Sequence, residues 1–195
     1  MAKVENNVKG KVAKIEIRKK VIDWLGGVAN VRVFDAFAGS GTMWREAWRD
    51  AGVYVGCDER AIYDATRALY VCDNERVMRS IDLEKFNVFD LDAFGSPWVL
   101  AYILANRRRV AAGERVAILT TDGAKLNARF GGIERTFAHL AGVKRDDVSA
   151  HAKWATLTRA GLGRVADMMG AGVEWVDVRD NFGPSKCQVY SAAAM

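Results

Sequence analysis

The sequence has few of the residues that build disulfide frameworks or metal centres. It contains three cysteines, which are far apart and form no CxxC pair, and only two histidines. An odd number of cysteines without metal-ligand spacing favours reduced thiols. A disulfide framework and a His-rich metal centre are therefore not expected, and the sequence predicts no bound metal. Two prolines and 27% charged residues also argue against a largely disordered chain.

Long apolar segments are missing as well. No apolar run approaches the roughly 20 residues that a helix needs to cross a bilayer. The charged first 20 residues are not followed by the apolar core of a secretory signal. We therefore expect a soluble, cytoplasmic protein without a membrane partner. A chain of 195 residues, half of them hydrophobic, suits a single domain over 1–195, with a basic N-terminal helix in 1–28 and a catalytic core in 29–195.

Positive charge is in excess. The formal net charge is +5 and the isoelectric point is about 9.2, which suits a polyanionic partner such as a nucleic acid. The basic residues cluster at two places: Lys9, Lys11, Lys14, Arg18, Lys19 and Lys20, and then Arg107, Arg108 and Arg109. Solvated helix faces explain the same clusters equally simply. Nothing in the composition fixes the oligomeric state.

Apolar runs and amphipathic stretches alternate along the chain. The expected helices cover 9–25, 42–50, 61–70, 97–109 and 149–169, and the expected strands cover 31–35, 53–57, 77–81, 88–91, 115–120, 173–178 and 187–191. The stretch 124–148 is irregular, and we expect substrate contacts there. Strands separated by helices favour a mostly parallel sheet covered on both faces, and the last two strands favour an antiparallel hairpin. The predicted fold class is α/β, a Rossmann-like sheet of seven strands of the kind found in methyltransferases.

The strongest local signal is a glycine-rich turn after the strand 31–35. The strand ends at Asp35 and leads into Gly39-Ser40-Gly41 at the start of a helix, and glycines there let the backbone pass close to a ligand. The third glycine of a dinucleotide fingerprint would fall at Trp44, which disfavours a nicotinamide cofactor. A P-loop is excluded because no Gly-Lys-Ser/Thr follows the turn.

Acidic residues follow the next two expected strands. Asp58 can accept hydrogen bonds from both ribose hydroxyls of an adenosine, and Asp82 or a neighbouring backbone group can meet the adenine amino group. Together with the glycine turn, these acids predict S-adenosyl-L-methionine as the cofactor. The expected cofactor-binding residues are Asp35, Phe37, Gly39, Ser40, Gly41, Asp58, Glu59, Asp82 and Leu83.

The strand 88–91 ends in a distinctive segment, Asp90-Leu-Asp-Ala-Phe-Gly-Ser-Pro97. Here the chain resembles the tRNA guanine-N2 dimethyltransferases, class I enzymes that use S-adenosylmethionine and carry an Asp-Pro-Phe-Gly-Ser-Pro motif. The resemblance places the motif aspartate on Asp92 and the aromatic on Phe94, with Ala93 in place of the proline. It extends to Leu119–Ala124, with Asp122 at the matching acid, and covers 31–192. The C-terminal domain of that family is not expected in this chain.

The same residues fit methyl transfer to an amine. The lone pair of an exocyclic amine is delocalised into the base, and an acceptor such as Asp92 can bind the N–H and orient that lone pair. Phe94 offers a face on which an extruded base can stack. With Asp92 and Phe94 as catalytic residues, the sequence predicts an N-methyltransferase that acts on an exocyclic amino group of a nucleic-acid base. The resemblance implies guanine N2 in RNA, ahead of DNA.

Other interpretations remain open. Asp90 can support the turn without touching substrate, and Asp122 can form a wall of the pocket. Phe94 and Trp98, like the tryptophans in amphipathic elements, can be plain core residues. The methyl acceptor can also be a small molecule or a protein. A module that binds nucleic acid without catalysis is the third alternative.

Overall fold

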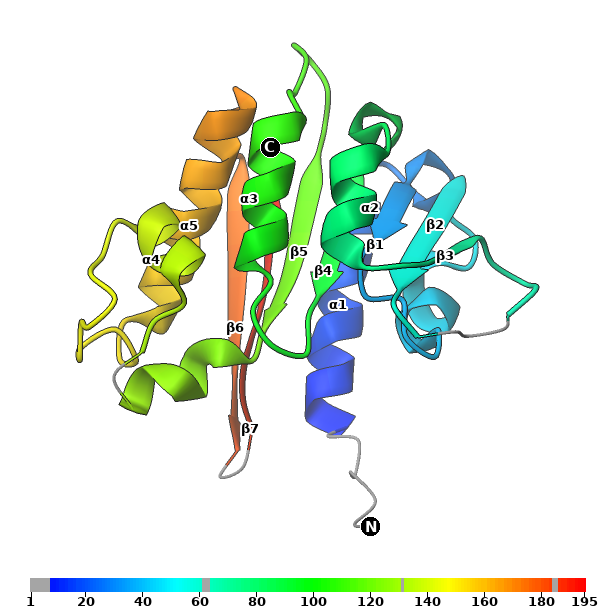
Figure 1. The fold of residues 1–195 in the computed structure, drawn as a ribbon. Helices are drawn as coiled ribbons and strands as arrows, with labels where there is room; N and C mark the ends of the chain where they lie inside the picture. Colours follow the sequence, from blue (N-terminus) through cyan, green and yellow to red (C-terminus); the bar gives the residue numbers. More distant parts are fainter. Residues whose placement is uncertain (1–7, 61–63, 131, 184–185) are drawn as a thin grey trace.

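One mixed sheet organises the molecule, with helices on both of its faces (Figure 1). The computed structural model describes residues 8–60, 64–130, 132–183 and 186–195. The strand order is β3-β2-β1-β4-β5-β7-β6, with seven strands. The strands are β1 Arg32–Asp35, β2 Val53–Asp58, β3 Leu69–Val71, β4 Val88–Asp92, β5 Ala117–Asp122, β6 Trp175–Gly183 and β7 Lys186–Ala194. Strands β1 to β5 are parallel, whereas β7 is antiparallel to both β5 and β6. The predicted fold class is confirmed.

Helices cover the two faces unequally. Helix α1 (Val8–Trp24) and a short π-helical turn, η2 (Trp44–Trp48), contact each other on one face. The other face carries α2 (Asn74–Ser80), α3 (Trp98–Arg107), α4 (Arg135–Ala141) and α5 (Trp154–Met169). Three short 3₁₀ turns lie at Val28–Asn30, Leu83–Lys85 and Ala124–Phe130. None of the helices in the described ranges is long and apolar enough to cross a membrane.

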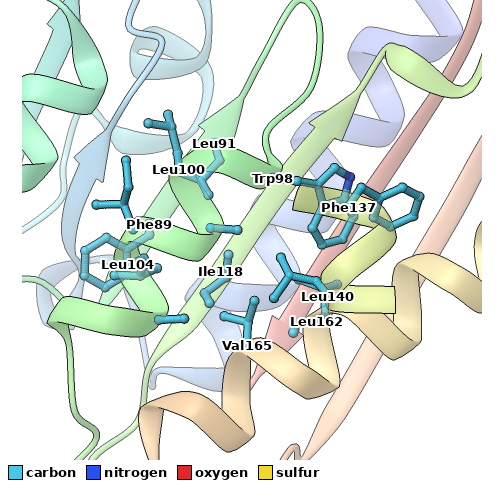
Figure 2. Close-up of a cluster of buried hydrophobic side chains, with 14 of the residues drawn as sticks. Phe89, Leu91, Trp98, Leu100, Leu104, Ile118, Phe137, Leu140, Leu162 and Val165 are labelled. Carbon is cyan, nitrogen blue, oxygen red and sulfur yellow. The ribbon is translucent and has the colours of Figure 1, made fainter. Parts of the chain in front are cut away.

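The larger core lies between the sheet and α3, α4 and α5. Figure 2 shows Phe89 and Ile118 of the sheet facing side chains of α3 and α5, among them Leu104 and Val165. All four are buried. Phe89 and Ile118 point to this face because alternate residues of a strand lie on the same side of the sheet. Full burial of one such side chain stabilises the fold by about 1.5–3 kcal/mol.

The core on the α1 face contains charge. Ile17 and Val21 of α1 pack on the sheet, and between them Arg18 donates two hydrogen bonds of 2.7 Å to Asp90 of β4. The indole Nε1 of Trp48 donates to the same carboxylate at 2.7 Å. Arg18 is 2% exposed and Asp90 is fully buried. A buried ion pair is tolerated only when its polar atoms are satisfied in this way, so the pair fixes α1 and η2 to the centre of the sheet.

The largest difference from the predicted elements lies between residues 61 and 81. Residues 61–63 of the predicted helix 61–70 lie outside the described residues, and its end is β3 instead. The strand predicted at 77–81 is wrong, because α2 occupies that stretch. Asp73 caps α2 by accepting a 2.8 Å hydrogen bond from the backbone N–H of Arg76, which favours the helix.

The remaining differences concern the ends of elements. The irregular stretch 124–148 contains α4, which begins where the Glu134 carboxylate accepts hydrogen bonds from two backbone N–H groups, those of Thr136 and Phe137. The helix predicted from 149 begins only at Trp154. The predicted helix 42–50 ends in the π-helical turn of η2. Both strands of the terminal hairpin are longer than predicted, nine residues each.

Removal of the buried cation tests how α1 is anchored. Arg18→Met leaves Asp90 buried without its partner, so we expect the free energy of unfolding to fall by about 3–5 kcal/mol in urea denaturation. Arg179→Met is the control, because Arg179 pairs at 2.5 Å with Glu16 of α1 at an exposed position. Such a pair contributes about 1 kcal/mol or less. Similar small losses in both variants would contradict the anchoring role of Arg18.

Candidate active site

Acidic residues end four neighbouring strands at one edge of the sheet. Because β1, β2, β4 and β5 are parallel, their last residues, Asp35, Asp58, Asp92 and Asp122, all lie at the carboxyl edge. This is the edge where open α/β sheets bind ligands. Within the described ranges, no group of three or more His, Cys, Asp or Glu side chains is arranged to hold a metal ion.

The glycine turn after β1 is tied to the end of β2. The backbone N–H of Gly39 donates to Oδ2 of Asp58 at 3.0 Å, and Arg60 donates to Oδ1 from its backbone and its guanidinium. Gly39 and Gly41 have φ angles of 43° and 78°, which glycine adopts without strain. Burial alone would raise the pKa of Asp58, but the hydrogen bonds from Arg60 and Gly39 hold it below its ordinary value. The turn therefore lies beside a carboxylate that is ionised near neutral pH.

Sequence reasoning missed the residue that supports this turn, Arg67. Its guanidinium donates to the carbonyl oxygens of Ala38 at 2.9 Å and Gly39 at 2.6 Å, and to Asp64 at 2.7 Å. A Cβ at Gly41 would lie 3.0 Å from the guanidinium carbon of Arg67. The turn and the buried arginine therefore require each other. An isolated arginine in an irregular segment gives no sequence signal for this role.

Two cations of α1, Lys14 and Arg18, pair with the two acids of β4. Lys14 Nζ lies 2.5 Å from Oδ1 of Asp92, and Arg18 Nη2 lies 3.2 Å from its Oδ2. Burial would raise the pKa of Asp92, but Arg18 and Lys14 hold it below its ordinary value. Burial and the charge of Asp90 raise the pKa of Asp35 to about 7. Near neutral pH, Asp92 is therefore anionic while Asp35 is poised to take up a proton.

The segment after β4 presents one aromatic ring to solvent. Phe94 is 94% exposed, whereas Trp98 is fully buried. Phe94 is thus not a core residue and Trp98 is. The backbone N–H of Gly123, just after β5, donates to the carbonyl of Gly95 at 2.8 Å. A Cβ at Gly123 would lie 2.5 Å from the carbonyl oxygen of Phe94, so this close approach requires a glycine.

Asp122 and Asp90 are both fully engaged inside the protein. Oδ2 of Asp122 accepts hydrogen bonds from the indoles of Trp98 at 2.7 Å and Trp154 at 3.2 Å, and its Oδ1 accepts from the backbone of Ala124. Burial raises the pKa of Asp122 to about 6, against the effect of these hydrogen bonds. Both carboxylates are completely buried and bonded to protein groups. They therefore suit a structural role and not contact with a substrate.

The structure corrects the position of Asp82 and Leu83. They follow α2, not a strand, and lie at the opposite edge of the sheet. The nearby carbonyl of Lys85 accepts a 2.9 Å hydrogen bond from Nε of Arg32, the first residue of β1. Asp82 caps a 3₁₀ turn and Leu83 is a core residue. Neither can reach a ligand at the carboxyl edge.

Asp73 is the acid that follows β3, and sequence reasoning missed it. It is exposed, and its neighbour Asn74 donates a 3.4 Å hydrogen bond to the carbonyl of Ala36, just after β1. Asp73 therefore takes the place at the carboxyl edge that was predicted for Asp82. Its signal in the sequence is the Cys-Asp-Asn-Glu run after a short apolar segment, a pattern typical of a helix start.

The basic clusters of the sequence are largely occupied by internal partners. Besides Lys14 and Arg18, Lys11 pairs with Glu46 at 2.6 Å and Lys20 with Asp177 at 3.3 Å. Arg107 donates to the carbonyl of Met78, Arg108 pairs with Glu114, and Arg109 donates to the carbonyl of Ala105. The side chain of Lys9 lies outside the described residues. Lys19 is exposed, whereas the other members of the two clusters whose side chains the structure describes have partners within the protein.

The sheet order and the helices on both faces define a Rossmann-like α/β fold, which solved methyltransferase structures share. Trm1 from Pyrococcus horikoshii, solved in complex with S-adenosyl-L-methionine, is similar at a TM-score of 0.50 and 16% identity, over 94% of this chain and 55% of that chain. TYW2 from M. jannaschii in complex with AdoMet is similar at a TM-score of 0.53 and 14% identity, over 93% of this chain and 74% of that chain. This chain thus spans about half of the Trm1 chain. No family model and no curated protein matches the sequence.

The contact between Gly123 and Phe94 can be tested through stability. Gly123→Ala forces a side chain against the Phe94 carbonyl, and overpacking of this kind costs about 1–3 kcal/mol. The free energy of unfolding in urea is the measurement. Gly95→Ala is the matched control, because nothing lies within 4 Å of a Cβ at that position. Equal stability of the two variants would show that the two loops are not in contact.

Proposed function

We propose that the protein is an S-adenosyl-L-methionine-dependent N-methyltransferase that acts on an exocyclic amino group of a nucleic-acid base, RNA in preference to DNA. The observation that carries the proposal is the convergence at one sheet edge of the glycine turn, the anionic Asp58 and the Asp92–Phe94 segment. The fold supports it, since both similar structures are complexes with this cofactor.

The cofactor fits the residues at the ends of β1, β2 and β3. Asp58 can accept hydrogen bonds from the ribose hydroxyls once the exposed side chain of Arg60 moves aside. Phe37, Ser40 and Glu59 complete the proposed contacts on either side. Asp73 replaces Asp82 as the acid near the adenine amino group. The negative edge also favours a cofactor that carries a sulfonium and an ammonium group.

The Asp92–Phe94 segment supplies the groups that a base amine needs. When bound, the cofactor would supply a methyl group attached to a sulfonium sulfur. The rest of the cofactor would be the leaving group, a neutral thioether. Asp92 is ionised, so it accepts the amine N–H and directs the nitrogen lone pair toward the methyl carbon. Phe94 offers an exposed ring on which the base stacks, an interaction worth about 1–3 kcal/mol. Guanine N2 is the acceptor that the family resemblance implies.

A small molecule is the second candidate acceptor. The internal pairing of most of the basic residues favours it, because a phosphate would have to compete with their acidic partners. The exposed ring of Phe94 serves a free heterocyclic amine as well as a base in RNA.

Transfer of labelled methyl groups distinguishes these candidates. Purified protein is incubated with methyl-labelled S-adenosylmethionine and separate pools of tRNA, ribosomal RNA, DNA, protein and small metabolites. We expect label in RNA, and a loss of about 100-fold or more in Asp92→Ala. Asp82→Ala is the matched control, an exposed aspartate at the opposite edge, and it should keep full activity.

Each other outcome is decisive. Label only in metabolites would establish the second candidate, and label only in protein would overturn both. Full activity of Asp92→Ala would remove the role assigned to that residue. No label in any pool would contradict the proposed transferase.

A further inference from the structure

Asp92 is held by neighbours from two elements. Lys14 and Arg18 of α1 lie at its two carboxylate oxygens, at 2.5 and 3.2 Å, and Thr121 of β5 hydrogen-bonds to it. The Asp92 side chain is 12% exposed, so one side of it still faces solvent. Its orientation is fixed by the protein before any substrate arrives.

Lys14 is itself held in place. Its ammonium lies 5.4 Å from the ring centroid of Tyr190 on β7, and its side chain is 19% exposed. Its backbone carbonyl accepts a 2.9 Å hydrogen bond from Arg18, the residue that anchors α1. The ammonium therefore contacts both Asp92 of β4 and the ring of Tyr190 on β7, and the hydrogen bond from Arg18 fixes the backbone that carries it.

The two cations are not equivalent for Asp92. Arg18 makes its shorter hydrogen bonds to Asp90, at 2.7 Å, and contacts Asp92 only with its second terminal nitrogen. Lys14 directs its shortest contact to Asp92. Around these groups lie the further carboxylate of Asp35 on β1 and the phenol of Tyr190 on β7. The charge of Arg18 also acts on three carboxylates, those of Asp90, Asp92 and Asp35, so without Lys14 they would all depend on it among the described residues.

We propose that Lys14 is a positioning residue for methyl transfer, which keeps the Asp92 carboxylate ionised and oriented toward the acceptor amine. The inference rests on the proposed function. In the reaction the N–CH₃ bond forms as the S–CH₃ bond breaks, and the bonding electron pair stays on sulfur. The amine nitrogen then gives up a proton, which Asp92 can accept and pass to water. A protonated Asp92 could not accept this proton, so the cation at its side sets the pH range of the reaction.

The test compares neutral and charged replacements on α1. Lys14→Met removes a positive charge beside Asp92, so Asp92 should titrate at higher pH. The ¹³Cγ signal of its carboxyl group in NMR measures this titration. The acidic limb of the kcat profile should move to higher pH with it. At pH 6 we expect kcat to fall by about tenfold or more, with the KM for S-adenosylmethionine unchanged.

Two controls separate positioning from general damage. Lys14→Arg keeps the cation and should keep the acidic limb of the wild type. Lys20→Met removes a lysine from the same helix that pairs with Asp177, and it should leave the titration of Asp92 unchanged. Lys14→Gln is the second neutral variant if Lys14→Met does not fold, as judged by its thermal melting.

The outcomes are distinct. An Asp92 titration that is the same in wild type and the neutral variant would overturn the proposal. So would a shifted titration with an unmoved kcat profile. If the wild type transfers no methyl group, the proposed function fails. The NMR titration then still shows whether Lys14 controls the charge of Asp92.

Discussion

The buried pair of Arg18 and Asp90 connects the N-terminal helix to the middle of the sheet. Because Asp90 lies two residues before Asp92, the same contact places α1 beside the candidate catalytic carboxylate. Trp48 donates to the same carboxylate, so η2, the element that follows the glycine turn, is fixed as well. Removal of Arg18 would leave the buried charge of Asp90 without its counter-ion, so packing alone does not determine this face of the molecule.

Because the Arg18–Asp90 pair places α1 beside the acids of β4, it also determines the charges at the carboxyl edge of the sheet. Lys14 and Arg18 balance two of the three acids of β1 and β4, and Asp35 is the acid whose pKa lies near 7. At the end of β2, Asp58 keeps its negative charge through its hydrogen bonds to the glycine turn and Arg60. One end of the edge thus suits a cationic cofactor, and the other presents an oriented carboxylate beside an exposed aromatic ring.

The sequence predicts four of the five parallel strands (β1, β2, β4 and β5) and the glycine turn, because buried strands are continuous apolar runs and turns need particular residues. It does not predict β3, since three half-exposed residues, Leu69–Val71, are too short to show a period. Asp82 is misplaced for the same reason. The contact of Lys14 with Asp92 joins residues 78 positions apart, and no local pattern encodes it. The family motif finds Asp92 but not the residues that hold it.

Binding of S-adenosyl-L-methionine tests the central claim most directly. In a calorimetric titration, the wild-type protein should bind the cofactor at one saturable site. Asp58→Ala should bind it about tenfold more weakly or worse, because hydrogen bonds to a charged group contribute about 1.5–3 kcal/mol. Absence of binding by the wild type, or equal affinity in Asp58→Ala, would contradict the account of the carboxyl edge as a cofactor site.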